Sequence, residues 1–403
     1  MARWQSIRQR RPRLSLRQGG DRSRKVLATC SGAHLIHDGF SDALYLLMPI
    51  WAEAFGLSLT QIGALKAAYS GALACFQVPA GLLSERFGER VLLWTGTVAA
   101  GLGYLAIGLA DGFVMLIAML VFAGLASGVQ YPLSSALVAR TFADGNRRAA
   151  LGVYNFAGDL GKIGAPLLVG AFVFVIGWRG ASAFYGALGI LAGVALFCVL
   201  RRIEIGAVVP RAPDEAPPRG WGIRNRPAFA AISGIAMIDS ATRYGFLIFL
   251  PFLLAERGAG VGMVGIALAL TFAGGAAGKL VCGLVAERVG TVRLVVLTEI
   301  ATGAAILLVP VLPTYAIMAL LPVIGLALHG TSSVLYGTVA DLVDESRPSR
   351  AYGLFYTLGI GAGAASPVLF GVLGDSAGVA AALTGMGILA LCALPLCPVL
   401  RHR

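Results

Sequence analysis

Long apolar runs dominate this sequence, and short hydrophilic segments separate them. About 20 helical residues cross the hydrocarbon core of a bilayer, and a helix satisfies its own backbone hydrogen bonds there. We predict twelve membrane-spanning helices, at residues 26–55, 60–84, 91–110, 113–138, 149–175, 178–200, 227–255, 260–286, 293–312, 315–340, 351–374 and 378–400. The predicted fold class is an all-α integral membrane protein.

Composition and charge distribution agree with a bilayer environment. Of 403 residues, 57% are hydrophobic and 13% are charged, whereas soluble domains have about 25% charged residues. The net charge of +12 could suggest nucleic acid, but the basic residues concentrate in residues 1–25 and 201–226. Basic residues favour the cytoplasmic side of a membrane. We therefore predict a bacterial inner membrane location, cytoplasmic termini, and the lipid bilayer as partner with no nucleic acid.

An octapeptide with a glycine at each end and a Glu-Arg pair inside it occurs twice. It stands at residues 81–88 (GLLSERFG) and, 202 positions later, at residues 283–290 (GLVAERVG). Each copy follows a long apolar run, which predicts a short charged loop at the end of a membrane helix. Other matches at offsets of 202 or 201 are Pro49 with Pro251, Gly63 with Gly265, Pro166 with Pro367, and Gly170 with Gly371. The chain is therefore predicted to consist of two related halves.

This repeat divides the chain into four parts. We predict a basic cytoplasmic tail at 1–25, an N-terminal six-helix bundle at 26–200, a cytoplasmic linker at 201–226 and a C-terminal six-helix bundle at 227–400. Both halves begin on the same side, so they are parallel repeats. In transporters built this way the substrate lies near the bilayer midplane between the halves, and rocking of the halves exposes it to each side in turn.

The first octapeptide, extended to residues 81–90, reads glycine, any residue, apolar, any residue, acid, base, any residue, glycine. This pattern is similar to the signature of the major facilitator superfamily, and the whole chain resembles a transporter of that family. It differs from the usual form at Glu85, where aspartate is commoner, and at Glu89, where a basic residue is common. The resemblance implies a carrier that works by alternating access, usually as a monomer.

Shorter stretches carry finer resemblances. The fifth predicted helix has part of the glycine and proline pattern of family members that act as antiporters, namely Gly152, Gly161, Ala165-Pro166 and Gly170. Residues 34–38 (HLIHD) and 131–135 (YPLSS) look most like efflux proteins of the fosmidomycin-resistance type. The membrane-embedded arginine of the family's fourth helix is missing, and Val121 occupies the nearest position.

Charged side chains at membrane depth cost roughly 2.5–3.5 kcal/mol each on insertion scales, so each needs a partner or a role. In the first predicted helix His34, Asp38 and Asp42 are four residues apart and share one stripe, with His37 beside it. Asp38 lies about 18 Å from the start of this helix, near mid-depth. We predict Asp38, Asp42, His37 and Asp159 as candidates for carrying a proton. The alternative is that Asp38 or Asp42 pairs with a cation of the fifth or seventh predicted helix and only stabilises the bundle.

Candidates for substrate binding begin with Asp239 and Arg243, which are four residues apart in the seventh predicted helix. The guanidinium stays charged and presents a rigid fork of donors, which suits an anionic substrate, although a structural ion pair is the alternative. Lys162, three residues after Asp159, has the same two interpretations. Further candidates to line the cavity are His34, Gln130, Tyr131 and His329. The other embedded charges are predicted to lie near helix ends in structural roles: Lys66, Lys279 and Glu299.

The first octapeptide is also a candidate gate, with Gly81, Glu85, Arg86, Gly88 and Arg90 as its residues. When the cavity is closed to the cytoplasm, Glu85 is expected at the positive N-terminal end of a neighbouring helix, with Arg86 and Arg90 paired across the inner surface. Contacts present in only one conformation bias the equilibrium between two. The alternative is a loop whose arginines only fix the orientation of the chain.

These observations predict a secondary transporter and not an enzyme. The first hypothesis is a proton-coupled antiporter that exports a small organic compound. The alternatives are a proton-coupled uptake symporter for a small organic anion or nutrient and, from another class, a transport-inactive sensor or scaffold. The partners implied are a small-molecule substrate and protons, with no metal and no cofactor. The sequence leaves the substrate and the direction of transport open.

Overall fold

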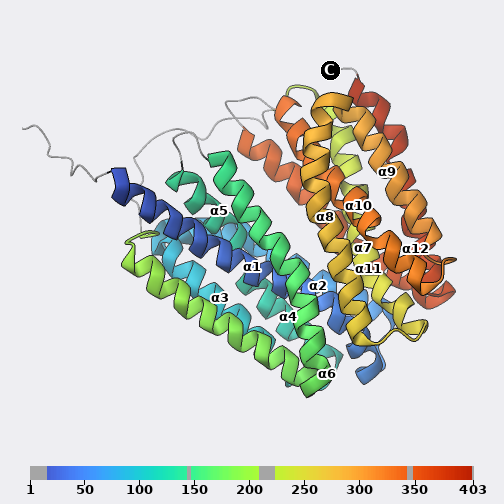
Figure 1. Cartoon of the computed structure of the whole chain (residues 1–403), viewed down its shortest axis with the longest axis horizontal. Helices are drawn as coiled ribbons and strands as arrows, with labels where there is room; N and C mark the ends of the chain where they lie inside the picture. The colour runs from blue at the N-terminus through green and yellow to red at the C-terminus, as the bar shows by residue number, and fades with distance from the viewer. Residues whose placement is uncertain (1–15, 143–146, 208–222, 343–347, 402–403) are drawn as a thin grey trace, which may run out of the picture.

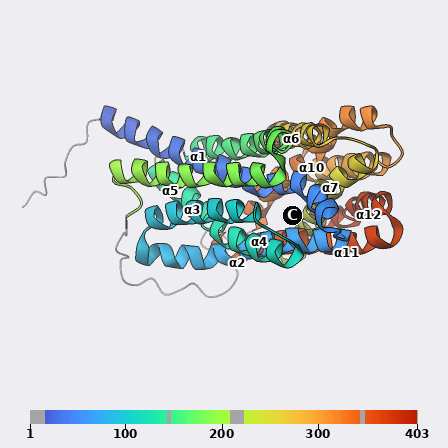
Figure 2. The same ribbon diagram turned by 90° about the horizontal axis from the view of Figure 1, so that it is seen from below.

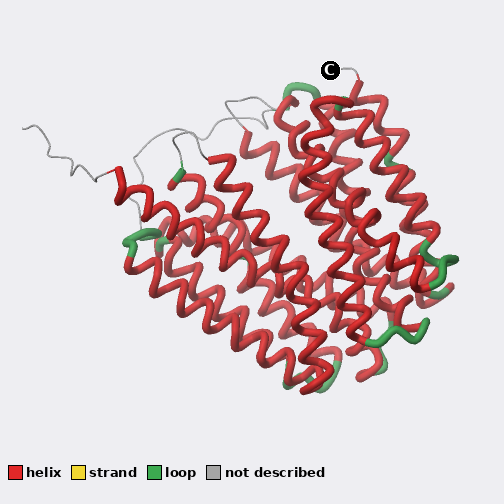
Figure 3. The backbone as a smooth tube through the Cα atoms, in the orientation of Figure 1, coloured by secondary structure: helices red, strands yellow, loops and turns green. Residues whose placement is uncertain are grey.

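The computed structural model describes residues 16–142, 147–207, 223–342 and 348–401. Helices joined by short turns form nearly all of this described chain (Figure 3). They are α1 (Leu16–Phe55), α2 (Leu59–Phe87), α3 (Glu89–Ile107), α4 (Phe113–Ser127), α5 (Gln130–Thr141), α6 (Arg147–Arg202), α7 (Arg226–Glu256), α8 (Val261–Val289), α9 (Thr291–Leu308), α10 (Thr314–Leu342), α11 (Pro348–Ala377), α12 (Val379–Leu391) and the 3-10 helix η1 (Leu394–Arg401). Within the described ranges, nine helical segments are long and apolar enough to cross a membrane.

The twelve predicted spans map onto these helices with two differences. The span predicted at 113–138 is divided into α4 and α5, because Pro132 has no N–H to donate to the carbonyl of Gly128. The spans predicted at 149–175 and 178–200 are two helices, as expected; they share the label α6 and meet directly at Gly177, whose backbone is not helical. The last predicted span continues from α12 into η1, where a proline interrupts the α-helical hydrogen bonds. The all-α fold of two six-helix halves is otherwise as expected.

The start of α1 lies inside the segment predicted to be a tail. Asp21 and Lys25 are four residues apart and form an ion pair of 2.6 Å, which supports a helical turn there. Arg22 donates hydrogen bonds of 3.0 Å to the carbonyls of Ile203 and Glu204 at the end of α6. The first helix is therefore longer than predicted and lies against the end of its own half.

The repeated octapeptide is helical, which corrects the prediction of a loop. Residues 81–87 form the last turns of α2, and only Gly88 leaves the helix, with φ of 79°. The second copy ends α8 in the same way, and Gly290 there has φ of 87°. Residues other than glycine rarely adopt positive φ, so the closing glycine alone makes each turn. The residues before it favour a helix.

Positive-φ glycines give direct structural support for the repeat. They recur in three pairs at the offsets found in the sequence: Gly56 with Gly258, Gly88 with Gly290, and Gly177 with Gly378. Each pair joins corresponding helices of the two halves. The same backbone turns are thus present at matching places, which chance similarity of a short motif would not produce.

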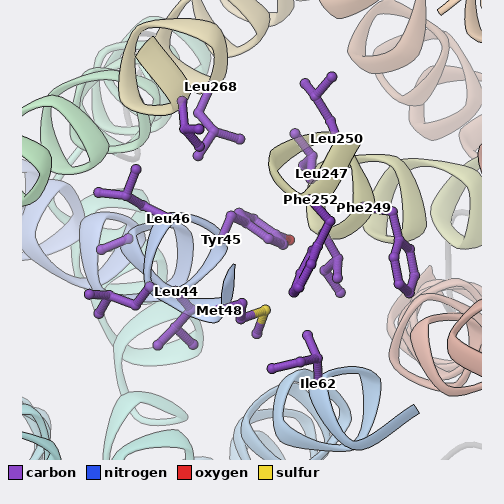
Figure 4. Packing of buried hydrophobic residues seen from close by; sticks show 14 of the residues in the cluster. Leu44, Tyr45, Leu46, Met48, Ile62, Leu247, Phe249, Leu250, Phe252 and Leu268 are labelled. Atoms are coloured by element: carbon purple, nitrogen blue, oxygen red, sulfur yellow. The ribbon is translucent and has the colours of Figure 1, made fainter. Parts of the chain in front are cut away.

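The two halves touch at one end of the molecule and separate toward the other (Figure 1). Seen from below, the N-terminal half and the C-terminal half lie side by side (Figure 2). We call the end with the α1–α2 and α7–α8 turns the hairpin end, and the end where α1 begins and η1 finishes the terminal end. The largest hydrophobic cluster combines residues of both halves, including Tyr45 and Met48 of α1 with Leu250 and Phe252 of α7 (Figure 4). Two smaller clusters each belong to a single half. The shared core therefore closes the hairpin end.

Matching glycines and prolines make the contact between the halves. Gly63 of α2 packs against the carbonyl of Pro367 in α11, and Gly265 of α8 packs against the carbonyl of Pro166 in α6. These four residues are repeat partners, so the two contacts are related by the internal symmetry. Small residues let membrane helices approach closely, which explains the glycines at these two positions.

One polar contact at the hairpin end lacks a symmetric counterpart. The carboxylate of Asp375 in α11 accepts hydrogen bonds from the backbone N–H groups of Leu59 and Thr60, at 2.7 and 3.0 Å, and from the Thr60 hydroxyl at 2.5 Å. It therefore caps the start of α2, where unpaired N–H groups and the helix dipole favour an anion. At an offset of 201 its partner position is Phe174, which is apolar. The cap adds a directional contact to the closed end.

Replacing Gly63 by valine should open the hairpin end, because a side chain there overlaps the Pro367 carbonyl. The expected result is a shift to longer distances between spin labels at Ala54 and Ser376 in a cysteine-free background, measured by electron–electron double resonance. Gly71→Val is the matched control. Gly71 lies on the same helix, and a Cβ added there would have no neighbouring atom of the described structure within 4 Å. Identical distance distributions for the two variants would show that this contact does not hold the halves together.

Candidate functional site

The centre of the N-terminal half is built around Asp38 of α1, which is almost fully buried. Its carboxylate lies 3.2 Å from Nε2 of His34 and 3.1 Å from Nζ of Lys162 in α6. It also accepts a hydrogen bond from the hydroxyl of Tyr131 in α5. Gly158 allows this arrangement, because a Cβ there would come within 2.5 Å of Asp38 and 2.6 Å of His34. Three elements of one half therefore meet at a single carboxylate.

A second carboxylate extends the charges to the other half. Nζ of Lys162 lies 3.5 Å from Asp159, and Asp159 lies 2.5 Å from Nζ of Lys279 in α8. We call Asp38, Lys162, Asp159 and Lys279 the charged chain. Two anions and two cations alternate along it, so each buried charge has an opposite neighbour that offsets part of its desolvation. The Asp159–Lys279 pair joins the two halves.

The C-terminal half has its own cation, Arg243 of α7. Its guanidinium lies 3.3 Å from Asp239 and donates hydrogen bonds of 3.2 Å to Ser240 and 2.6 Å to Ser332 of α10. The predicted pairing of Asp239 with Arg243 within one helix is therefore present. Because the hydroxyls of Ser240 and Ser332 each accept a hydrogen bond from it, the guanidinium has a defined direction.

In three ion pairs of this region the cation is more accessible than its carboxylate. The side chain of Lys162 is 25% exposed and that of Asp38 is 2% exposed. Lys279 is 35% exposed and Asp159 is 10% exposed, while Arg243 is 15% exposed and Asp239 is 4% exposed. The carboxylates lie behind the cations, so the surface that remains accessible is positive. We call Lys162, Lys279 and Arg243 the cationic face.

The other predicted proton carriers, Asp42 and His37, form no ion pair with the charged chain among the described residues. Asp42 is buried on α1 and interacts electrostatically with Lys162 and Lys66. His37 faces α3, where its Nε2 lies 3.0 Å from the hydroxyl of Thr97. The structure thus brings Asp38 and Asp159 together but directs His37 into the interior of its own half.

The remaining substrate candidates are also buried within their halves. Gln130 accepts a hydrogen bond of 2.7 Å from Ser134, one turn further along α5. His329 of α10 packs against Phe272 and Gly275 of α8, and its Nδ1 lies 3.2 Å from the carbonyl of Gly325. Both side chains are at most 7% exposed. Of the candidates outside the charged chain, Tyr131 and His34 touch it directly.

Three embedded charges were predicted to be structural groups near helix ends, but their side chains lie in the interior of the structure. Lys66 is fully buried, donates to the carbonyl of Ser41 at 2.8 Å and lies over the ring of Tyr45. Lys279 belongs to the charged chain, and Glu299 is 1% exposed. Lys279 is ten residues before the end of α8, about 15 Å along the helix axis, so its depth alone could have indicated an interior position.

Residues of the predicted gate surround the turn at Gly88. Gly81 and Arg86 lie in the last turns of α2, and the guanidinium of Arg86 lies over the ring of Phe87. The backbone N–H of Arg90 donates to the carbonyl of Gly206 at 2.9 Å. The side chain of Glu85 lies outside the part that the structure describes.

Glu89 has a partner that the sequence did not predict. It forms an ion pair with Arg140, which links the start of α3 to the end of α5. The acidic residue at this unusual position of the signature is therefore engaged within its own half. Gating by this region remains a prediction, because it concerns a conformation closed at the terminal end.

Two parallel six-helix repeats, with opposite charges meeting between them, are an architecture typical of membrane carriers. The model of the Major Facilitator Superfamily matches residues 30–240 and 232–403, and the chain belongs to this family. A solved structure, the bacterial homolog of the human lysosomal transporter Spinster in an inward-facing and unoccupied conformation, aligns with a TM-score of 0.77 and 15% identity. It covers 94% of this chain and 97% of that one, which shows the fold.

Curated relatives give more detail on this class. The chain is 28% identical over 250 residues to the probable L-galactonate transporter of Escherichia coli, covering 58% of this chain and 55% of the relative. It is 25% identical over 358 residues to the hexuronate transporter of Bacillus subtilis, covering 84% of each. It is 31% identical over 256 residues to an MFS-type efflux pump of Mycolicibacterium smegmatis, covering 61% of this chain and 59% of the relative. The protein is thus a transporter of small organic solutes and not an enzyme.

Proposed function

We propose that this protein carries a small organic anion across the bacterial inner membrane together with protons. The cationic face is the observation that supports this proposal most strongly. Three cations are accessible between the halves, and their carboxylate partners lie deeper. An accessible cation attracts an anion, and Arg243 can bind a carboxylate through two parallel hydrogen bonds.

Two of the relatives support an acidic substrate. L-galactonate and hexuronates are small polyhydroxylated carboxylates, and transporters of both are similar to this chain. A carboxylate suits the cationic face, while sugar hydroxyls suit serine and tyrosine hydroxyls such as those of Ser332 and Tyr131. The efflux antiporter that the sequence favoured first becomes the second candidate.

The proposed cycle begins with the conformation described above. With both termini in the cytoplasm, as the basic N-terminal region favours, the terminal end faces the cytoplasm and the protein is open inward. A substrate carboxylate at the cationic face competes with Asp159 for Lys279 and with Asp239 for Arg243. A displaced carboxylate loses its counter-ion and gains affinity for a proton. Asp38, Asp42, Asp159 and His37 remain the proposed proton carriers of the N-terminal half.

Rocking to the outward-open state requires the hairpin end to separate. The Asp375 cap and the two symmetric glycine contacts must then break, and new contacts must form at the terminal end. The residues around Gly88 are placed at that end and are proposed as its gate. Only contacts that differ between the two states can bias the equilibrium between them.

Efflux remains the second candidate because of a specific relative and a specific pattern. The efflux pump of M. smegmatis is 31% identical over its aligned region. The glycine and proline pattern near Pro166 also favours efflux. So does the resemblance of residues 34–38 and 131–135 to efflux proteins of the fosmidomycin-resistance type. In that case the same charged chain would exchange protons against an exported compound.

The test is flux into proteoliposomes containing the purified protein, with D-galacturonate and L-galactonate as labelled probes and neutral D-galactose as control. Accumulation of an acid under an inward proton gradient, with none of D-galactose, supports the proposal. Movement of solute against the direction of the protons supports efflux. Equal handling of the acids and D-galactose would contradict a role for the cationic face in selecting anions.

A further inference from the structure

Glu299 is a buried carboxylate that the proposed cycle does not use. It lies near the middle of α9, about 12 Å from the start of that helix. Its side chain is 1% exposed, and its Oε1 atom has no hydrogen-bond partner among the described residues. One turn further along the same face, the Thr302 hydroxyl is also buried without a partner. An ionised carboxylate in such a place is costly, so this one needs either a positively charged partner or a proton.

The groups that face Glu299 come from several helices. Among the described residues, the charged groups that interact with it are Asp239 and Arg243, both of α7. From α10, Thr331 is bonded to Thr298 at 2.8 Å, and Ser332 is bonded to Arg243. The α12 helix approaches α9 through apolar groups and Gly387. Two carboxylates therefore share the surroundings of one guanidinium.

The internal repeat supports a direct contact between the two carboxylates. At the offset of 202, Asp239 corresponds to His37 and Glu299 to Thr97, and the side chains of His37 and Thr97 lie 3.0 Å apart. The alignment of these helices is supported independently by glycine contacts. Gly101 packs on Gly186 in the N-terminal half, and their partners Gly303 and Gly387 pack on each other in the C-terminal half.

We propose that Asp239 and Glu299 hold one proton between them and form a proton-binding site inside the C-terminal half. Two neighbouring carboxylates in an apolar interior cannot both stay ionised with a single guanidinium to balance them. A shared proton leaves one net negative charge, which Arg243 balances. The shared proton would also give Oε1 of Glu299, which has no hydrogen-bond partner among the described residues, a hydrogen bond to Asp239.

This site would link the proton to the substrate through Arg243. A substrate carboxylate that binds Arg243 neutralises part of the positive charge that balances Asp239. The pair of Asp239 and Glu299 then holds its proton more tightly. By reciprocity, a bound proton then raises the affinity for the anion. The shared proton is inferred from the structure alone, whereas this coupling role rests on the proposed function.

The direct test is infrared spectroscopy of the full-length protein in lipid during a pH titration, with no transported solute present. A neutral carboxylic acid has a carbonyl band that a carboxylate lacks. We expect a titrating acid band that is lost in Glu299→Gln and shifted in Glu299→Asp, and that is unchanged in Glu256→Gln, which removes an exposed carboxylate. A band that survives Glu299→Gln unchanged, or a band abolished by Na⁺ at constant pH, would overturn the proton site.

The coupling role has a separate test in proteoliposomes. With D-galacturonate as probe, Glu299→Gln should lose accumulation driven by a proton gradient but keep exchange of labelled for unlabelled probe, because exchange needs no net proton movement. Loss of both activities in a folded variant, or retention of both, would overturn the coupling role. If the wild-type protein moves none of the acids, the proposed function fails while the infrared result still decides the proton site.

Discussion

Replacing Lys162 by methionine should lower the free energy of unfolding by about 3–5 kcal/mol, the cost of breaking a buried ion pair on one side only. The methionine side chain keeps much of the volume and the apolar stem of lysine but has no charge. Asp38, which is 2% exposed, would then keep only His34 and Tyr131 as polar partners. The measurement is chemical unfolding in mixed micelles, followed by tryptophan fluorescence.

A double substitution separates the ion pair from simple packing. Asp38→Asn combined with Lys162→Met removes both charges, so it should recover a large part of the stability lost in Lys162→Met. Lys162→Arg keeps the charge and should cost less than the methionine variant. If the double variant is as unstable as the sum of the two single variants, the Asp38–Lys162 contact carries no coupling energy and the charged chain is not an energetic unit.

Replacing Arg243 by alanine should weaken binding of an acidic substrate by about 30-fold or more. This estimate follows from the roughly 2–5 kcal/mol lost when one partner of a buried, hydrogen-bonded charge pair is truncated, with about 1.4 kcal/mol for each factor of ten. The same change leaves Asp239 without its ion pair of 3.3 Å. The measurement is binding of D-galacturonate to the purified protein by calorimetry, next to a thermal unfolding curve.

Two further variants make the result specific. Arg243→Lys keeps the charge but loses the fork, so its affinity should fall between wild type and Arg243→Ala. Arg293→Ala removes an exposed arginine of α9 and should leave affinity unchanged. Wild-type affinity in a folded Arg243→Ala variant would mean that the Asp239–Arg243 pair is only structural and that the cationic face does not bind the substrate.

Local sequence rules were sufficient for most of the fold. Membrane helices must satisfy their backbone internally, so the apolar runs determined the number of spans, and the recurring glycines indicated the two halves. The errors lie where one residue changes the outcome. Pro132 interrupts one predicted helix, and Gly88 is the only residue of its octapeptide that leaves the helix.

Definite pairs could be predicted only where the partners share a helix, and a pair of Asp38 with a cation of the fifth predicted helix was offered only as an alternative. The spacing of four residues gave the pair of Asp239 with Arg243, and the spacing of three gave Asp159 with Lys162. The contacts of Asp38 with Lys162 and of Asp159 with Lys279 depend on how α1, α6 and α8 pack. Spacing along the chain carries no information about such contacts. Lys279 was therefore missed as a partner.

Glu299 illustrates a second reason for the missed residues. Its position along α9 suggested a place near the membrane surface, yet the side chain points to the interior of its half and is 1% exposed. The repeat contained the necessary signal, because the matching Thr97 is buried as well and bonds to the partner position of Asp239. Comparing the two halves position by position is thus more informative than depth alone.

If an anion and a proton cross the membrane together, addition of the substrate alone must move protons. Proteoliposomes are loaded with a pH-sensitive dye, no pH gradient is imposed, and D-galacturonate is added outside with valinomycin and potassium to clamp the membrane potential. Our account predicts acidification of the lumen with D-galacturonate and none with D-galactose. Transport of labelled D-galacturonate without acidification, or with alkalinisation of the lumen, would contradict it.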